Sequence, residues 1–237
     1  MDDHDAVVAV RMLDVPNGEK ATSRYLWPEI EVAFVIDARC TDVQMVEADA
    51  ASVESRLVAG EIVCPGCGGE LRPWGHARWR TLRDHGRPVR LRPRRSRCRS
   101  CLATHVLLPV LALLRRLDLA AVIVETLVAR HVESRTRVEL TRSMGAPWDT
   151  VRGWLRRFER KAVEIRFEFA ALAHRWDADI GPIEPRATAA LDALEAMGLA
   201  AAAAVRRFGP TPLWALVAGA SGGRLLANTS SPIPGEG

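Results

Sequence analysis

The chain has 237 residues, of which 48% are hydrophobic and 26% charged, with a formal net charge of +4. This length and composition exclude a disordered tail and predict one or two domains with a buried core. No apolar run reaches the roughly 18 residues of a membrane span, and the N-terminus lacks the basic start and apolar run of a secretory signal. We therefore expect a cytoplasmic protein without a membrane partner.

The first 61 residues form a small acidic region of mixed α and β character. Residues 1–60 carry 12 acidic against 5 basic side chains. Strands are predicted over 30–36 and, more weakly, over 43–46, and a short helix over 49–59. Three roles stay open for this region: a surface for a partner protein, a cover for basic residues elsewhere, and a solubilising domain.

Two C-x-x-C pairs carry the sharpest chemical signal, Cys64 with Cys67 and Cys98 with Cys101, thirty residues apart. Each pair brings two thiolates to one side of a tight knuckle, and two knuckles supply the four sulfurs of a closed tetrahedral site. In a reducing compartment such cysteines are typical of metal ligands rather than disulfides. We therefore predict a structural Zn²⁺ ion held by these four residues.

Other interpretations of the cysteines and histidines remain. A thioredoxin-like dithiol at Cys64 and Cys67 would need a βαβ surrounding and leaves the second pair unexplained. His76, His85 or His105 could replace one ligand. Cys40 has no partner at ligand spacing and is predicted to be a small buried apolar side chain.

Between the cysteine pairs lies an arginine-rich hairpin. Residues 71–83 and 89–97 are predicted strands, joined by a turn-forming cluster at 84–88, which gives a zinc ribbon over 62–103. Residues 71–100 contain 11 arginines and a single acid, Asp84. Arginines at a period of two would form one positive face, either for nucleic acid or merely solvated, while Trp74 and Trp79 could stack on bases or cover the metal core. The arginines expected to contact DNA are Arg78, Arg80, Arg90, Arg92, Arg94 and Arg95.

A helical bundle is predicted over 104–170. Its first helix runs over 118–131 with Asp118 as its cap, and its second runs over 134–144 and ends at Gly145. A short turn and a third helix follow, which together indicate a helix-turn-helix whose exposed helix start could approach phosphates or base edges, although a plain three-helix bundle is the alternative. The residues expected on the DNA-facing side are Trp148, Asp149, Thr150, Arg152, Arg156 and Arg157.

The remaining chain is predicted to hold an alanine-rich helical region over 171–220, with helices over 186–207 and 212–218, and a flexible tail over 221–237. The helices should pack on the bundle or mediate a homodimer. Asp177, Asp179 and Glu184 could be a Mg²⁺ cluster, but nearby glycine and proline favour a solvated linker. The predicted fold class is α+β, mainly α.

Residues 62–165 resemble the N-terminal part of bacterial insertion-sequence transposases, which begin with a zinc ribbon and continue into a helix-turn-helix. The resemblance implies a module that binds transposon ends, followed in that family by an RNase-H-like domain with three metal-binding carboxylates. Only 67 residues follow residue 170, too few for such a domain. The matching motifs are Cys-Pro-Gly-Cys at 64–67, Trp74-Gly75-His76, Leu82-Arg83-Asp84, Val89-Arg90-Leu91-Arg92, Arg97-Cys98-Arg99-Ser100-Cys101, Leu107-Leu108-Pro109 and the segment 145–158.

These features together predict a zinc-dependent, nucleoid-associated protein that binds double-stranded DNA and has no catalytic centre of its own. By the resemblance it would be an accessory protein of a mobile element, acting beside a separately encoded transposase or integrase. The first alternative is a transcriptional regulator of the helix-turn-helix type. The second is a divergent transposase or nuclease whose carboxylates are not recognisable in the sequence.

Overall fold

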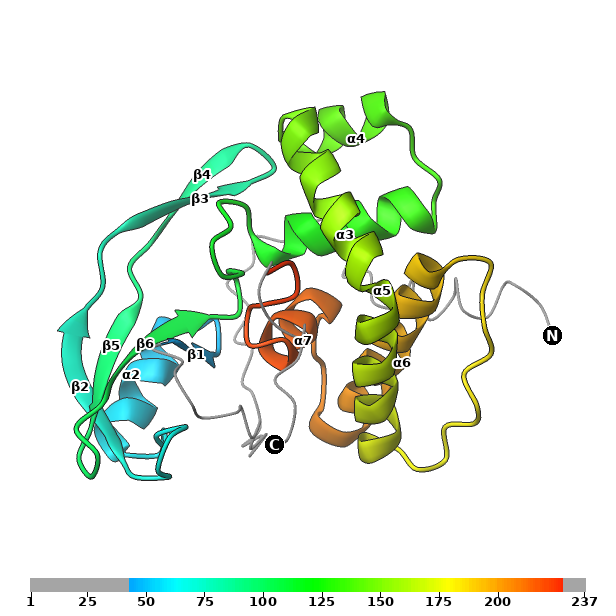
Figure 1. Ribbon diagram of the computed structural model, residues 1–237. Helices are drawn as coiled ribbons and strands as arrows, with labels where there is room; N and C mark the ends of the chain where they lie inside the picture. Colours follow the sequence, from blue (N-terminus) through cyan, green and yellow to red (C-terminus); the bar gives the residue numbers. More distant parts are fainter. Residues whose placement is uncertain (1–42, 228–237) are drawn as a thin grey trace.

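The computed structural model describes residues 43–227 and is shown in Figure 1. The described chain has six helices and six strands in two small sheets, which confirms the predicted α+β class. A β-rich part holds the two cysteine pairs, and a helical part lies beside it (Figure 1). The strand predicted over 30–36 and Cys40 lie outside the described residues.

The first described elements agree with the prediction. Strand β1 (Val43–Val46) is followed by helix α2 (Ala50–Ala59). Asp49 caps the helix by accepting a hydrogen bond from the Ser52 amide at 2.9 Å, and Gly60 ends it in the left-handed conformation. Both helix ends are therefore set by local side-chain and backbone chemistry that can be seen in the sequence.

The larger sheet has four strands in the order β1, β6, β5, β2. The last three are β2 (Leu71–His76), β5 (Arg94–Cys98) and β6 (Thr104–Pro109); β1 runs parallel to β6, and β5 runs antiparallel to both of its neighbours. The helical bundle predicted over 104–170 is therefore wrong for residues 104–109, which form β6, because a short continuous apolar run fits a buried strand as well as a buried helix.

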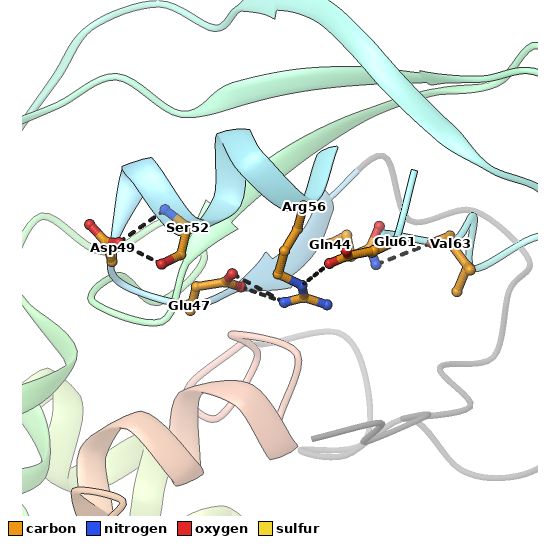
Figure 2. A network of polar contacts seen from close by, with 7 residues as sticks. All are labelled: Gln44, Glu47, Asp49, Ser52, Arg56, Glu61 and Val63. Carbon is orange, nitrogen blue, oxygen red and sulfur yellow. Dashed lines mark hydrogen bonds and ion pairs between the residues drawn. The ribbon is translucent and has the colours of Figure 1, made fainter. Parts of the chain in front are cut away.

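A network of polar contacts holds α2 and the following chain against β1 (Figure 2). Arg56 of α2 donates to both carboxylate oxygens of Glu47 at 3.1 and 3.0 Å and lies 3.7 Å from Glu61. Gln44 of β1 donates to the Val63 carbonyl at 3.3 Å. These contacts fix the segment that leads directly into the first cysteine pair.

The two long strands predicted for the arginine hairpin are wrong in extent. The hairpin is divided between β2 with β5 in the larger sheet and a separate pair, β3 (Arg80–Asp84) with β4 (Arg87–Leu91). Gly75 has a φ of 85°, and the β2–β5 register is irregular between Pro73 and His76. The Ala77 amide donates to the Pro93 carbonyl at 2.8 Å, but Pro93 has no N–H to donate in return, so the β2–β5 ladder ends at this pair.

The hairpin turn is tighter than the predicted cluster at 84–88. It consists of two residues, His85 and Gly86, with φ angles of 47° and 83°. Two successive positive φ values give the type I′ geometry that matches the twist of the flanking strands.

All the predicted helices of the second half are present: α3 (Ala120–His131), α4 (Arg137–Met144), α5 (Trp148–Trp176), α6 (Ala189–Phe208) and α7 (Leu213–Ala220). The predicted start of α4 at Ser134 is wrong, because Ser134 has a φ of 55°, and Thr136 is the cap with a reciprocal contact to Glu139. Gly145 ends α4 in the left-handed conformation, as predicted.

Asp118 does not cap α3, contrary to the prediction. The N-cap position is Leu119, which makes no side-chain hydrogen bond. The Asp118 carboxylate instead binds Arg83 of β3. A short polar side chain before an apolar helix is a good cap in isolation, but here a guanidinium from the hairpin takes both of its oxygens.

Helix α5 continues through residue 170 to Trp176 and packs along α6 (Figure 1). An ion pair between Arg206 and Asp177 joins the C-terminal ends of the two helices, which therefore run in the same direction. Residues 177–188 lead back from the end of α5 to the start of α6. Phe158, Ile165 and other apolar residues of α5 share one core with the alanines of α6.

The first part of the predicted flexible tail is packed. Leu225 and Leu226 are buried, and Arg116 donates to the Leu226 carbonyl. The Leu114 amide also donates to the Gly223 carbonyl at 2.8 Å. The tail prediction is therefore wrong for residues 221–227, because two leucines have core sites available, and residues 228–237 lie outside the described chain.

Candidate metal centre and basic surface

The structure brings the four predicted cysteine ligands together. Their sulfurs all lie within 4.8 Å of one another, with Cys64 to Cys101 at 3.7 Å and Cys67 to Cys98 at 3.5 Å. A tetrahedral site with metal–sulfur bonds of about 2.3 Å has sulfur–sulfur edges of about 3.8 Å. All four cysteines are free thiols rather than disulfides. Among residues 43–227 they form the one side-chain group that could hold a metal ion.

Local hydrogen bonds shape each knuckle. In the first, the Cys64 amide donates to the Gly69 carbonyl at 2.7 Å. In the second, the Ser100 amide donates to the Cys98 sulfur at 3.4 Å. The two knuckles approach closely at Gly69, where a Cβ atom would lie 2.4 Å from the Ser100 hydroxyl. A side chain at position 69 would therefore press on Ser100 in the second knuckle.

One cysteine of each pair is buried and the other is exposed. Cys64 and Cys98 lie in a small core with Leu57, Leu71 and Leu107, which connects the knuckles to α2 and the larger sheet. Burial raises the pKa of Cys64 to about 12. Burial also opposes ionisation of Cys98, but hydrogen bonds from neighbouring amides and thiols lower its pKa to about 6. Cys98 would therefore bind a metal ion as a readily formed thiolate, whereas Cys64 would have to lose its proton when the metal binds.

None of the three candidate histidines belongs to the four-sulfur cluster. His105 is buried beside it, with Nε2 3.4 Å from the Cys64 sulfur. A hydrogen-bonding group at this position orients a ligand instead of replacing it. His76 lies exposed at the end of β2, and His85 lies in the hairpin turn.

Five exposed arginines of the hairpin form what we call the hairpin arginine surface. Within the described chain, no carboxylate pairs with any of them. The predicted single face is wrong: Arg80 is opposite Leu91 and Arg90 is opposite Thr81 in successive cross-strand pairs, so the two arginines point to opposite faces. The positive charge surrounds the hairpin. The five residues are Arg78, Arg80, Arg87, Arg90 and Arg92.

Two of the predicted DNA contacts lie elsewhere. Arg94 donates to both carboxylate oxygens of Glu54 in α2, at 2.6 and 2.9 Å, and to the Gly75 carbonyl at 2.5 Å. These hydrogen bonds hold the pKa of Glu54 below its usual range. Arg95 is half-buried in the central strand β5. Both side chains belong to the sheet that supports the hairpin rather than to the hairpin arginine surface.

The hairpin tryptophans do not cover the metal site. Trp74 is 51% exposed and Trp79 is 55% exposed, and neither belongs to a core. The guanidinium groups of Arg90 and Arg92 lie 4.6 and 5.5 Å from the Trp79 ring centroid, and that of Arg97 lies 4.8 Å from the Trp74 ring centroid. Planar cations therefore stack on both rings.

At the start of α5, the packing side agrees with the prediction. Val151, Trp154 and Leu155 are buried against the other helices. Of the six predicted DNA contacts, Asp149 and Arg152 are exposed and paired at 3.1 Å, and Arg156 is also exposed. The other three are half-buried: Trp148 lies under Arg137, the Thr150 amide donates to the Pro147 carbonyl, and Arg157 donates to the Gly153 carbonyl.

The tip of the hairpin packs on the turn between α4 and α5 (Figure 1). A Cβ atom on Gly145 would lie 2.5 Å from the His85 carbonyl, so the two backbones are in direct contact. His85 also lies 2.9 Å from Glu125 of α3 through Nε2 and 2.9 Å from Asp84 through Nδ1. This contact places the hairpin arginine surface next to the start of α5. No local sequence signal reveals it.

The three acidic residues considered as a Mg²⁺ cluster are not a metal-capable group within the described chain. Asp177 instead accepts a hydrogen bond from Arg206 Nε at 2.8 Å. That contact explains why its carboxylate pKa lies below the usual range.

Within residues 43–227, none of the helices combines the length and apolar character needed to span a bilayer. Comparisons with protein-family models, curated proteins and solved structures found no match to this chain. The resemblance to insertion-sequence transposases therefore stays a hypothesis.

Proposed function

We propose that this protein binds double-stranded DNA through the hairpin arginine surface and the start of α5. The observation that carries the proposal is the contact of the hairpin tip with Gly145. It joins five arginines that have no carboxylate partner among residues 43–227 to the exposed Arg152 and Arg156. A concentrated positive surface on rigid elements is what recognition of a phosphate backbone needs.

In this proposal α4 and α5 act as a helix-turn-helix. The start of α5 would enter the major groove, with Arg152 and Arg156 reaching base edges or phosphates. The hairpin would contact the neighbouring backbone through its arginines, which fixes orientation rather than sequence. Arg152 would have to leave Asp149 in order to contact DNA. Their ion pair is exposed, so breaking it costs little free energy.

The metal in this proposal is a structural Zn²⁺ ion held by Cys64, Cys67, Cys98 and Cys101. Four thiolates at tetrahedral spacing suit Zn²⁺ and leave no open coordination position for a substrate. When bound, the ion would cross-link the chain at the base of the hairpin. The four cysteines would hold the ion and thereby keep the hairpin in position. We assign the protein no catalytic centre.

The link to transposition comes from the resemblance and is part of the proposal. An accessory protein of a mobile element should bind the element's termini, whereas a transcriptional regulator should bind promoters. Selection of genomic DNA fragments on the metal-loaded protein separates these two functions, because the enriched sequences identify the target.

DNA binding itself is tested by measuring the affinity for a duplex over a range of salt concentrations. We expect log affinity to fall linearly with log salt, with a slope that reflects several phosphate contacts. Arg92→Ala should reduce that slope by about one, and Arg152→Ala should relax sequence preference. Arg206→Ala, which removes a charge at the far end of α5 and α6, is the matched control and should leave the slope unchanged. Binding that ignores salt would refute the proposal.

A further inference from the structure

Two tryptophans of the hairpin are exposed where this residue type is normally packed. Trp154 is 2% exposed, and Trp148, Trp176 and Trp214 pack against the main core. Trp74 and Trp79, by contrast, each leave half of their surface in solvent. Tryptophan is enriched at binding interfaces, where a partner covers the ring that is exposed in the free protein.

The ring faces accept flat, positively charged groups in the free protein. Arg90 lies over Trp79 at 4.6 Å, and Arg97 lies over Trp74 at 4.8 Å. A nucleobase is also planar and stacks on the same kind of ring face. Because no carboxylate of the described chain pairs with Arg90 or Arg92, these guanidinium groups are available to move onto phosphates when a strand arrives.

The rings of Trp74 and Trp79 lie some distance from the start of α5. Trp79 precedes β3, and the hairpin tip that contacts Gly145 lies at the other end of that strand. Five residues of extended chain span about 17 Å. A strand leaving a duplex bound at α5 could therefore run along the hairpin and reach Trp79 first and Trp74 next.

Base pairing decides what these rings can bind. In a duplex, both faces of each base are covered by neighbouring bases, so an aromatic side chain can stack only where bases are unpaired or unstacked. Resting on the proposed DNA binding, we propose that Trp74 and Trp79 form a stacking surface for unpaired bases of a DNA strand that continues from the bound duplex.

The test uses the metal-loaded full chain and three labelled DNA probes at one salt concentration: a blunt duplex, the same duplex with a single-stranded extension of about ten nucleotides, and the extension alone. We expect the extension to strengthen duplex binding about tenfold, since each stacked base contributes substantially. The double variant Trp74→Ala, Trp79→Ala should lose most of this preference and keep only the part that the phosphates of the extension contribute. The variant with phenylalanine at both positions should retain most of the preference, because the rings remain.

Phe167→Ala is the matched control, since Phe167 is 64% exposed on α5, away from the hairpin. It should preserve the preference for the extended duplex. An equal affinity of the unaltered protein for the blunt and extended duplexes, or a preference that is undiminished in the double alanine variant, would overturn the stacking surface while leaving duplex binding intact. Failure of all three probes to bind would instead overturn the proposed function.

Discussion

Arg83 and Asp118, 35 residues apart, form a two-pronged ion pair that fastens the arginine hairpin to the helical part. Arg83 Nε and Nη2 donate to the two carboxylate oxygens at 2.9 and 2.7 Å. The backbone supports the pair, because the Arg83 amide donates to the Leu117 carbonyl and its carbonyl accepts from the Leu119 amide. The side chain of Asp118 is 2% exposed, so this contact is part of the interior.

Asp118→Ala should weaken this attachment. It removes both acceptors and leaves Arg83 without its partner, which is expected to cost about 1.5–3 kcal/mol of unfolding free energy. Chemical denaturation measures the cost, and amide exchange at Arg83 and Leu119 reports whether the hairpin has come loose. Asp149→Ala removes a carboxylate from an exposed pair with Arg152 and should change the unfolding free energy by less than about 1 kcal/mol. Equal effects of the two substitutions would contradict the assigned role of Asp118.

Gly145→Ala should displace the hairpin tip from the α4–α5 turn. Gly145 has a φ of 60°, which costs other residues about 1–2 kcal/mol, and its added Cβ would also meet the His85 backbone at 2.5 Å. We expect a clear loss of unfolding free energy together with weaker DNA affinity. Gly181→Ala is the comparison, because a Cβ there meets nothing within 4 Å. A Gly145→Ala protein as stable as Gly181→Ala would show that the tip contact is absent in solution.

Cys98→Ser should abolish metal binding. One ion per chain is expected in the unaltered protein, measured by elemental analysis together with the number of reactive thiols. The loss should expose the amides of the two knuckles to exchange, while α5 and α6 stay protected by their separate core. Cys40→Ser should keep the full metal content, since Cys40 was predicted not to be a ligand. Unchanged metal content in Cys98→Ser would exclude this set of ligands.

The contact of His85 with α3 should depend on pH. Partial burial opposes its protonation, but the carboxylates of Asp84 and Glu125 outweigh burial and raise the pKa of His85 above 6.5. A raised pKa in the folded protein means that the stabilisation is fully present below pH 6.5 and is lost as the pH rises through the folded value. His85→Gln should therefore remove a decline in unfolding free energy as the pH rises above 6.5.

His76→Gln gives the opposite comparison. Although the side chain of His76 is largely exposed, partial desolvation and the charges of Arg94 and Arg92 lower its pKa, so this residue opposes folding as the pH falls. Its replacement should raise the unfolding free energy at acidic pH.

If the pH profile of His85→Gln matched that of the unaltered protein, the contact between His85 and Glu125 would not contribute to stability.

Features set by neighbouring residues were predictable from the sequence. The spacing of Cys64, Cys67, Cys98 and Cys101 identified the four-sulfur cluster, because each knuckle is a local turn. Asp49 and Gly145 marked helix ends for the same reason. The start of α4 was predicted too early, at Ser134, because the nearby Thr136 is the residue that caps the helix.

The partners of long charged side chains could not be predicted. Arg94 was expected on a DNA-facing strand, yet it binds Glu54 of α2, 40 residues away. Asp118 had the sequence context of a helix cap and became the partner of Arg83. In each case several charged groups were equally plausible partners, and only the approach of distant backbones decided which pair could form.

The sequence by itself determined the helices, the cysteine knuckles and the concentration of arginine in one hairpin, because helix caps, turns and side-chain periodicity depend on residues close along the chain. The tertiary structure decided that the hairpin splits into two sheets, that its charge surrounds it, and that its tip packs on Gly145. Those outcomes depend on strand register and on contacts between distant backbones, whose free energy arises only when the whole chain is folded.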